Sequence, residues 1–211
     1  MSIKAVLWDI DGTLVDSEPL HLRALLAVCM QYNVDISDMP DDTFIGVNLN
    51  GVWDALKRRF PAHLTSEVWT ASIDEHYVRQ SETLRAMPGA IETIQSLHGL
   101  GIRQAAVSNS GRRVVDTNLD FLRTNGIFEF SISLDDVSEA KPSPTPYLQA
   151  LTRMNIEPSQ AVAIEDSRSG AKSARAAGLT LVAYNNPGLP ADVWIDDLKD
   201  LPSHLSNFPK T

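Results

Sequence analysis

The chain has 211 residues, a formal net charge of −9 at pH 7 and a pI near 4.9. Such an acidic chain offers no basic surface for nucleic acid, because that partner requires clustered lysine and arginine. The sequence has no apolar run near about 18 residues and no basic-then-apolar start, so it predicts neither a membrane span nor a secretory signal. We therefore expect a cytoplasmic protein that binds neither nucleic acid nor membrane.

The first chemical signal is the WDIDGTL segment at Trp8–Leu14, in which two aspartates are separated by one residue. The apolar run Ile3–Trp8 is typical of a buried strand, so Asp9 and Asp11 would lie at the carboxyl end where open α/β sheets bind ligands. One carboxylate there could attack an electrophile while the other moves the proton, and the pair would attract a hard cation. A solvated turn with a capping role is the alternative.

The interval from Val15 to Arg85 contains no convincing strand and predicts several amphipathic helices, interrupted at Pro40, Gly46 and Pro61. Their expected apolar positions are Leu22, Leu25, Leu26 and Cys29, then Val52, Leu56 and Phe60, and finally Val68, Trp69 and Ile73. Both ends of this insertion would lie close to the two aspartates, so it could close over the predicted site.

Further β-type runs occur at Ile102–Val107, Phe130–Leu134, Ala161–Ile164 and Leu179–Tyr184, with helical patterns after the first three. This alternation is typical of a parallel sheet covered by helices on both faces. The tail beyond the last run gives no chemical signal and is expected to finish the edge of the sheet. We predict an α/β fold with a Rossmann-like parallel-sheet core, residues 1–14 and 86–211, and an inserted α-helical cap domain, residues 15–85.

Polar residues follow the second predicted strand as Ser108-Asn109-Ser110-Gly111. A hydroxyl, an amide and a run of backbone donors before a helix suit the oxygens of a phosphate group. A turn with a helix cap is the alternative for this segment taken alone.

Two more clusters carry charge. Lys141 is followed by Pro142-Ser143-Pro144, whose prolines stiffen the loop that presents the lysine, and a compact ammonium can neutralise a phosphate or a reacting carboxylate. Glu165 and Asp166 follow the fourth predicted strand, and adjacent carboxylates repel each other unless a cation lies near them. A solvated surface lysine and a helix-capping aspartate are the respective alternatives.

In chain order, the segments WDIDGTLVDSE, VSNS, AKPSP and IEDSRSG resemble the four motifs of the haloacid dehalogenase superfamily, in particular its β-phosphoglucomutase-like phosphatases and mutases. The resemblance covers nearly the whole chain, and the insertion between the first two motifs matches the family's small helical cap. It implies a magnesium-dependent phosphatase that hydrolyses a small phosphorylated metabolite, such as a sugar phosphate, through an aspartyl-phosphate. The alternative is a β-phosphoglucomutase-like sugar phosphate mutase.

The resemblance also implies roles for individual residues. Asp9 would attack phosphorus, and Asp11 would protonate the leaving oxygen and then activate water. Mg²⁺ would be held by Asp9, the backbone carbonyl of Asp11 and Asp166, with Glu165 in or near its coordination shell. The residues expected to bind substrate or support this geometry are Thr13, Ser108, Asn109, Lys141, Glu18 and His21.

Two positions depart from the family's pattern. Thr145 stands where relatives commonly have an aspartate, which weakens a supporting contact more than the reaction. Leu49, two places after Gly46-Val47, stands where the mutases have an arginine that grips the distal phosphate. A mutase must hold a bisphosphate at both ends, so Leu49 favours a phosphatase unless Arg79 supplies that charge. The sequence predicts no oligomeric state.

Overall fold

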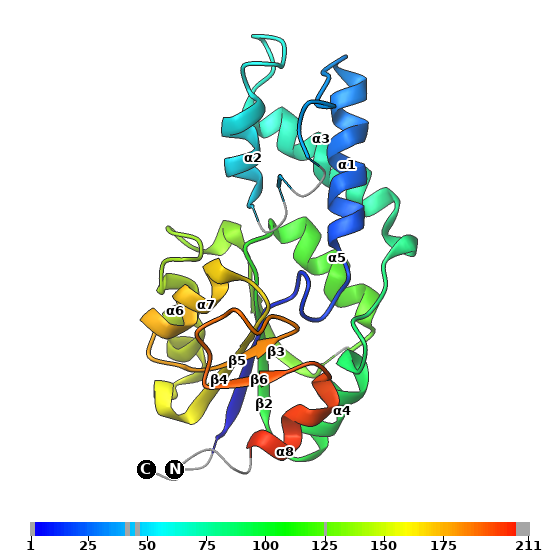
Figure 1. The fold of residues 1–211 in the computed structure, drawn as a ribbon. Coiled ribbons are helices and arrows are strands. Elements are labelled where there is room, and N and C mark those ends of the chain that lie inside the picture. Colours follow the sequence, from blue (N-terminus) through cyan, green and yellow to red (C-terminus); the bar gives the residue numbers. More distant parts are fainter. Residues whose placement is uncertain (1–2, 41–42, 45–46, 125, 206–211) are drawn as a thin grey trace. The chain divides into compact units, whose positions relative to one another are not determined.

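The protein is described here by a computed structural model, which covers residues 3–40, 43–44, 47–124 and 126–205 (Figure 1). The strands are β1 (Ala5–Trp8), β2 (Arg103–Val107), β3 (Phe128–Ile132), β4 (Ala161–Glu165), β5 (Thr180–Tyr184) and β6 (Val193–Ile195). The helices are α1 (Glu18–Gln31), α2 (Leu49–Leu56), α3 (Ser66–Arg79), α4 (Ala90–Gly99), α5 (Arg112–Leu122), α6 (Thr145–Met154), α7 (Arg168–Ala176) and α8 (Leu201–Leu205). Short 3₁₀ turns lie at Ser81–Thr83, Leu134–Asp136, Pro158–Gln160 and Leu198–Asp200.

The chain divides into two compact units, which we call the core unit (1–16 with 85–211) and the helical unit (17–84). The predicted junctions, after residue 14 and before residue 86, differ from these by a residue or two. Val15 forms bridges with Asp11 and Ala86, and the amide of Asp16 donates to the carbonyl of Arg85. These backbone contacts keep both connecting segments with the core unit.

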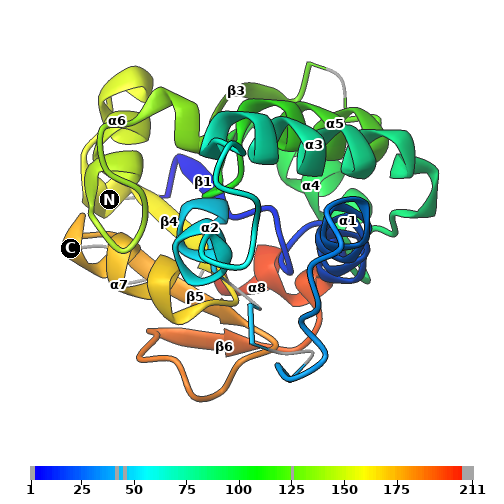
Figure 2. The same cartoon turned by 90° about the horizontal axis from the view of Figure 1, so that it is seen from above.

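The core unit is built on a parallel sheet with strand order β3-β2-β1-β4-β5-β6 among the described residues. Helices α6 and α7 cover one face, and α4, α5 and α8 cover the other (Figure 2). This arrangement confirms the predicted α/β fold with a parallel sheet covered on both faces. The predicted edge is also confirmed, because β6 pairs with β5 at the end of the sheet.

Side-chain alternation along the strands separates the two faces of the sheet. The odd-numbered positions of the central strands pack with α6 and α7, among them Leu7, Val107 and Ala163. On the opposite face the buried amide of Gln104 accepts from the indole of Trp8 at 2.9 Å and donates to the carbonyl of Ile94 in α4, also at 2.9 Å. The four central strands are therefore buried on both sides, which explains their continuous apolar runs.

The helical unit contains α1, α2 and α3, and its apolar faces differ in part from the prediction. The buried positions of α1 are Leu20, Ala24, Leu25, Val28 and Cys29. Leu26 is 41% exposed and Val68 of α3 is 51% exposed, so the predictions for these two residues were wrong. The buried face of α1 begins at Leu20 rather than at Leu22. Residues on this face recur every three or four positions, and Leu26 lies outside that pattern on the exposed side of the helix.

The interior of the helical unit is aromatic. The ring of Trp53 stacks on Phe60 and packs against Trp69, with ring centroids 5.9 and 5.4 Å apart. The predicted break at Gly46 lies outside the described residues. Among the described residues, no helix has the length and apolar content that a bilayer crossing requires.

Candidate active site

The chain reverses directly after β1 and holds two carboxylates at the carboxyl end of the sheet. The amide of Asp9 donates to the carbonyl of Ile164, which continues the β1–β4 ladder by one residue. The carbonyl of Ile10 then accepts from the amides of residues 13, 14 and 15, which closes the turn. Gly12 has φ +81°, and a Cβ there would lie 2.2 Å from an oxygen of Asp166. Glycine is therefore required for the turn and for the close approach of the two segments.

A buried lysine lies at the centre of the site. The Nζ of Lys141 donates to Asp9 Oδ1, Glu165 Oε1 and the carbonyl of Val107, each at 2.7 Å. Its side chain is 2% exposed, and those of Asp9 and Glu165 are 9% and 0% exposed. All three protons of the ammonium thus have acceptors, and a surface lysine is excluded.

Burial and charge act in opposite directions on this cluster. Burial raises the pKa of Asp9 well above its ordinary value, Lys141 lowers it, and Glu165 and Asp166 raise it further. Burial alone would lower the pKa of Lys141, but the Coulombic attraction of Asp9 and Glu165 raises it above its ordinary value. The lysine is therefore a fixed positive charge, and further positive charge near Asp9 would favour the anionic form of this carboxyl, whose pKa is raised.

The loop that carries Lys141 is held by the side chain of Asn109. The Nδ2 of Asn109 donates to the Lys141 carbonyl at 3.0 Å, and its Oδ1 accepts from the Lys141 amide at 2.8 Å. Because Asn109 comes directly after Ser108, the segment after β2 and the lysine loop are fixed to each other. Asn109 therefore positions Lys141 through its side chain, a contact that the sequence did not predict.

Glu165 is held by several protein donors. Besides Lys141, its Oε1 accepts from the hydroxyl of Tyr147 at 2.6 Å, and its Oε2 accepts from Ser167 at 3.2 Å. A Cβ at Gly170 would lie 1.9 Å from this carboxylate, so the first turn of α7 approaches it as closely as glycine allows. In this arrangement Glu165 neutralises Lys141 and fixes its ammonium.

The cluster of three acidic side chains at this site fits a divalent metal ion. Asp9, Glu165 and Asp166 each offer a carboxylate oxygen within 4.8 Å of the others. Carboxylate oxygens are the ligands that hard cations such as Mg²⁺ prefer. Burial, then the charge of Glu165, raises the pKa of Asp166 to about 7, and this repulsion is what a bound cation would relieve. Asp9 and Asp166 are the stronger candidate ligands, because protein donors already hold both oxygens of Glu165.

The second aspartate of the first motif points to a different set of donors. The Oδ2 of Asp11 accepts from the hydroxyls of Ser108 and Ser110 at 2.9 and 2.8 Å. Its Oδ1 accepts from the amide of Asn118 in α5 at 3.1 Å. Asp11 thus accepts from the hydroxyls of Ser108 and Ser110 and the amide of Asn118, whereas Asp9 accepts from the ammonium of Lys141.

The remaining predicted residues lie in two places. The hydroxyl of Thr13 is 3.5 Å from Asp166 Oδ1, in the same cluster of the core unit. Glu18 and His21 lie on the first turn of α1 in the helical unit, where the ring of His21 packs against Tyr77 with centroids 4.6 Å apart. Their contact with substrate stays a prediction.

The two residues that depart from the family pattern, Thr145 and Leu49, each lie at the start of a helix. Thr145 starts α6, and its hydroxyl forms a 2.9 Å hydrogen bond with that of Ser143, so the lysine loop still joins the helix through polar side chains. Leu49 starts α2 after the cap residue Asn48. Arg79 is paired with Glu75 one turn earlier in α3 at 2.5 Å.

Two site residues of the core unit, Asn118 and Tyr147, were not predicted, and Ser110 was predicted only as part of the polar segment after β2. Asn118 had the clearest signal, because the buried positions of α5 are Val114, Val115, Asn118 and Leu122, and a polar residue interrupts an apolar stripe. Tyr147 is fully buried, and nothing in its local sequence identifies Glu165 as its partner.

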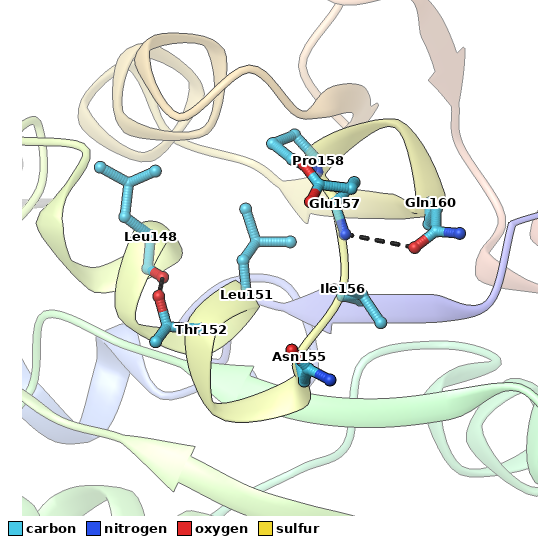
Figure 3. A pocket seen from close by; sticks show the side chains of 8 residues that line it. All are labelled: Leu148, Leu151, Thr152, Asn155, Ile156, Glu157, Pro158 and Gln160. Carbon is cyan, nitrogen blue, oxygen red and sulfur yellow. Dashed lines mark hydrogen bonds between the residues drawn. The ribbon is translucent and has the colours of Figure 1, made fainter.

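A separate hollow lies between α6 and the 3₁₀ turn at Pro158–Gln160, at the start of β4 (Figure 3). It is therefore at the opposite end of the strands from the carboxylate cluster. The side chains that line it are Leu148, Leu151, Thr152, Asn155, Ile156, Glu157, Pro158 and Gln160. Its lining has one carboxylate and no cationic side chain. It therefore lacks the paired carboxylates and the lysine that meet at the carboxyl end of the sheet.

Known proteins resemble this chain in sequence and in fold. Residues 6–184 match the family model for haloacid dehalogenase-like hydrolases. The chain is 29% identical to a phosphorylated carbohydrates phosphatase of Thermotoga maritima, with 84% of this chain and 82% of that protein covered. It is 30% identical to hexitol phosphatase B of Escherichia coli, with 94% of each covered. The crystal structure of CbbY from Rhodobacter sphaeroides in complex with phosphate superposes with a TM-score of 0.84 at 26% identity, covering 94% of this chain and 96% of that one.

The family match spans most of the chain, and the solved structure shares the fold over nearly its whole length. The matched residues contain all four motifs that meet at the carboxyl end of the sheet. The chain belongs to the haloacid dehalogenase-like hydrolase family.

Proposed function

We propose that the protein is a magnesium-dependent phosphatase that hydrolyses a small phosphorylated metabolite, such as a sugar phosphate, through an aspartyl-phosphate on Asp9. The observation that carries this proposal is the buried contact of Asp9 with Lys141, in one cluster with Asp166. Similarity to phosphatases that act on phosphorylated carbohydrates and hexitols supports the substrate class.

In the first step, an oxygen of Asp9 attacks phosphorus and the bond from phosphorus to the leaving oxygen breaks. Asp11 gives a proton to that oxygen, so that an alcohol leaves. In the second step Asp11 takes a proton from water, the hydroxide attacks phosphorus, and the acyl-phosphate bond breaks to release inorganic phosphate and Asp9. The different donors to the two aspartates, the ammonium of Lys141 for Asp9 and neutral groups for Asp11, support this division of roles.

Charge neutralisation is the main requirement of the reaction, because a phosphoryl group in transfer carries its charge on three oxygens. Lys141 supplies a fixed positive charge next to Asp9, and Ser108 supplies a hydroxyl for a phosphoryl oxygen. Asp9 and Asp166, with the backbone carbonyl of Asp11, would hold Mg²⁺, which supplies further positive charge when bound. Glu165 then acts as the partner of Lys141 more than as a metal ligand.

Two observations favour a phosphatase over a mutase. Leu49 stands where a mutase has an arginine for the distal phosphate, and Arg79, the other candidate for that charge, pairs with Glu75. The test is a screen of phosphorylated sugars, sugar acids and nucleotides for release of inorganic phosphate, with Mg²⁺ and with a chelator. We expect metal-dependent release from at least one small phosphate monoester. Rapid isomerisation of β-glucose 1-phosphate in the presence of its bisphosphate, without phosphate release, would identify a mutase instead.

A further inference from the structure

Asn118 is a buried amide with no role in the motifs described above. Its side chain is 0% exposed, and it occupies the packing stripe of α5 between Val115 and Leu122. Burying an amide without a hydrogen-bond partner is costly, so a polar residue at such a position requires an acceptor within reach. The amide reaches across to the loop after β1, where its Nδ2 donates to Asp11 Oδ1 at 3.1 Å.

The other oxygen of Asp11 is held in a different way. Both Ser108 and Ser110 donate their hydroxyl protons to Oδ2. A serine hydroxyl has one proton, so Ser108 cannot donate to Asp11 and to a phosphoryl oxygen at the same time. When the hydroxyl of Ser108 turns to the substrate, Oδ2 of Asp11 loses one hydrogen bond. The hydrogen bond from the Asn118 side chain to Oδ1 involves no group that binds phosphate, so it can remain.

We propose that Asn118 is a positioning residue for the acid–base step: it holds Oδ1 of Asp11 while Oδ2 exchanges its serine donors for the leaving oxygen or water. This inference rests on the proposed function. The hydrogen bond from Asn118 keeps the Asp11 carboxylate on the α5 side of the loop, with Oδ2 directed to the reacting atoms. Proton transfer depends on such orientation more than ground-state binding does, so the loss of Asn118 lowers kcat with little change in KM.

The test uses matched truncations on one helix, Asn118→Ala and Val115→Ala, with Asn118→Leu as a variant that fills the space without a donor. All are assayed with 4-nitrophenyl phosphate and with an alkyl phosphate, after thermal melts show that they fold. We expect both Asn118 variants to lose about 10-fold or more in kcat on the alkyl phosphate. Val115→Ala, which removes packing from the same face, should keep both kcat and KM.

A double-mutant cycle separates positioning from general support of the fold. If Asn118 acts through Asp11, then Asn118→Leu has no further effect on the residual rate of Asp11→Asn. Equal losses in both backgrounds, or a wild-type kcat in both Asn118 variants, would overturn the inference and leave the phosphatase assignment in place. A wild type that hydrolyses no phosphate monoester would overturn both.

Discussion

The ammonium of Lys141 is shared by two buried carboxylates, those of Asp9 and Glu165, so its removal affects folding as well as reaction. In Lys141→Ala, Asp9 and Glu165 remain buried without their cation, and breaking such a pair costs about 3–5 kcal/mol of unfolding free energy. We expect kcat to fall more than KM rises, because the lost charge acts most on the transferring phosphoryl group. Denaturant unfolding and steady-state kinetics on the same preparation measure both effects. A change confined to KM would contradict the proposed role.

Residues of the first motif were predictable because their chemistry is local in sequence. Two aspartates after an apolar run predict the end of a strand, and the structure places Asp9 and Asp11 there. The contacts of Glu165 were not predictable, since Tyr147 and Lys141 lie on other segments and meet it only in the folded chain. The sequence therefore predicted that the charged groups of the four motifs gather at the carboxyl end of the sheet, but it predicted neither their pairing nor the neutral partners Asn118 and Tyr147.

At the scale of elements, α7 begins so close to Glu165 that its third residue must be glycine. A Cβ at Gly170 would lie 1.9 Å from the carboxylate, whereas a Cβ at Gly99, at the end of α4, would meet nothing within 4 Å. Gly170→Ala should therefore displace Glu165, lower the melting temperature and reduce turnover. Its matched control, Gly99→Ala, should raise stability by about 0.4–1 kcal/mol because alanine restricts the unfolded chain. Melting curves and turnover of the pair test this, and two equal melting temperatures would contradict it.

The elements themselves were predictable to different degrees. The central strands were found within a few residues because they are buried on both faces and read as apolar runs. The expected run Phe130–Leu134 proved to be β3 at Phe128–Ile132, which precedes it by two residues. Its partly exposed residues give a weaker apolar signal. The faces of α1 and α3 were harder to assign, because apolar residues also occur on their exposed sides, as Leu26 and Val68 do.

For the whole molecule, the carboxylate cluster links stability, pH and metal. Burial raises the pKa of Asp9, and it raises that of Asp166 to about 7 from an ordinary 3.8. A carboxyl group whose pKa is higher in the folded protein than in the unfolded chain contributes fully to the free energy of unfolding below its ordinary pKa. This contribution is lost as the pH rises through the pKa of the folded protein. The contribution of Asp166 to the stability of the metal-free protein should therefore be lost between about pH 4 and about pH 7.

A metal ion binds the ionised carboxylates, so its stabilising effect should grow over the same pH range. We expect Mg²⁺ to raise the melting temperature more at about pH 8 than at about pH 5.5, relative to chelator. Asp166→Asn should reduce this difference because it removes one titrating ligand. An Mg²⁺ effect that is equal at both pH values in the wild type would contradict the assignment of the cluster as a metal site.

The most direct test of the phosphatase mechanism is to trap the phosphoryl group on the enzyme. In Asp11→Asn, 4-nitrophenyl phosphate should still phosphorylate Asp9, since nitrophenolate leaves without a proton, but water attack should slow by roughly 10²–10⁴-fold. Mass spectrometry after a rapid acid quench should then find one added phosphoryl group on the peptide that contains Asp9, and none in the Asp9→Asn, Asp11→Asn double variant. A phosphoryl group on another residue, or wild-type turnover by Asp9→Asn, would contradict the account.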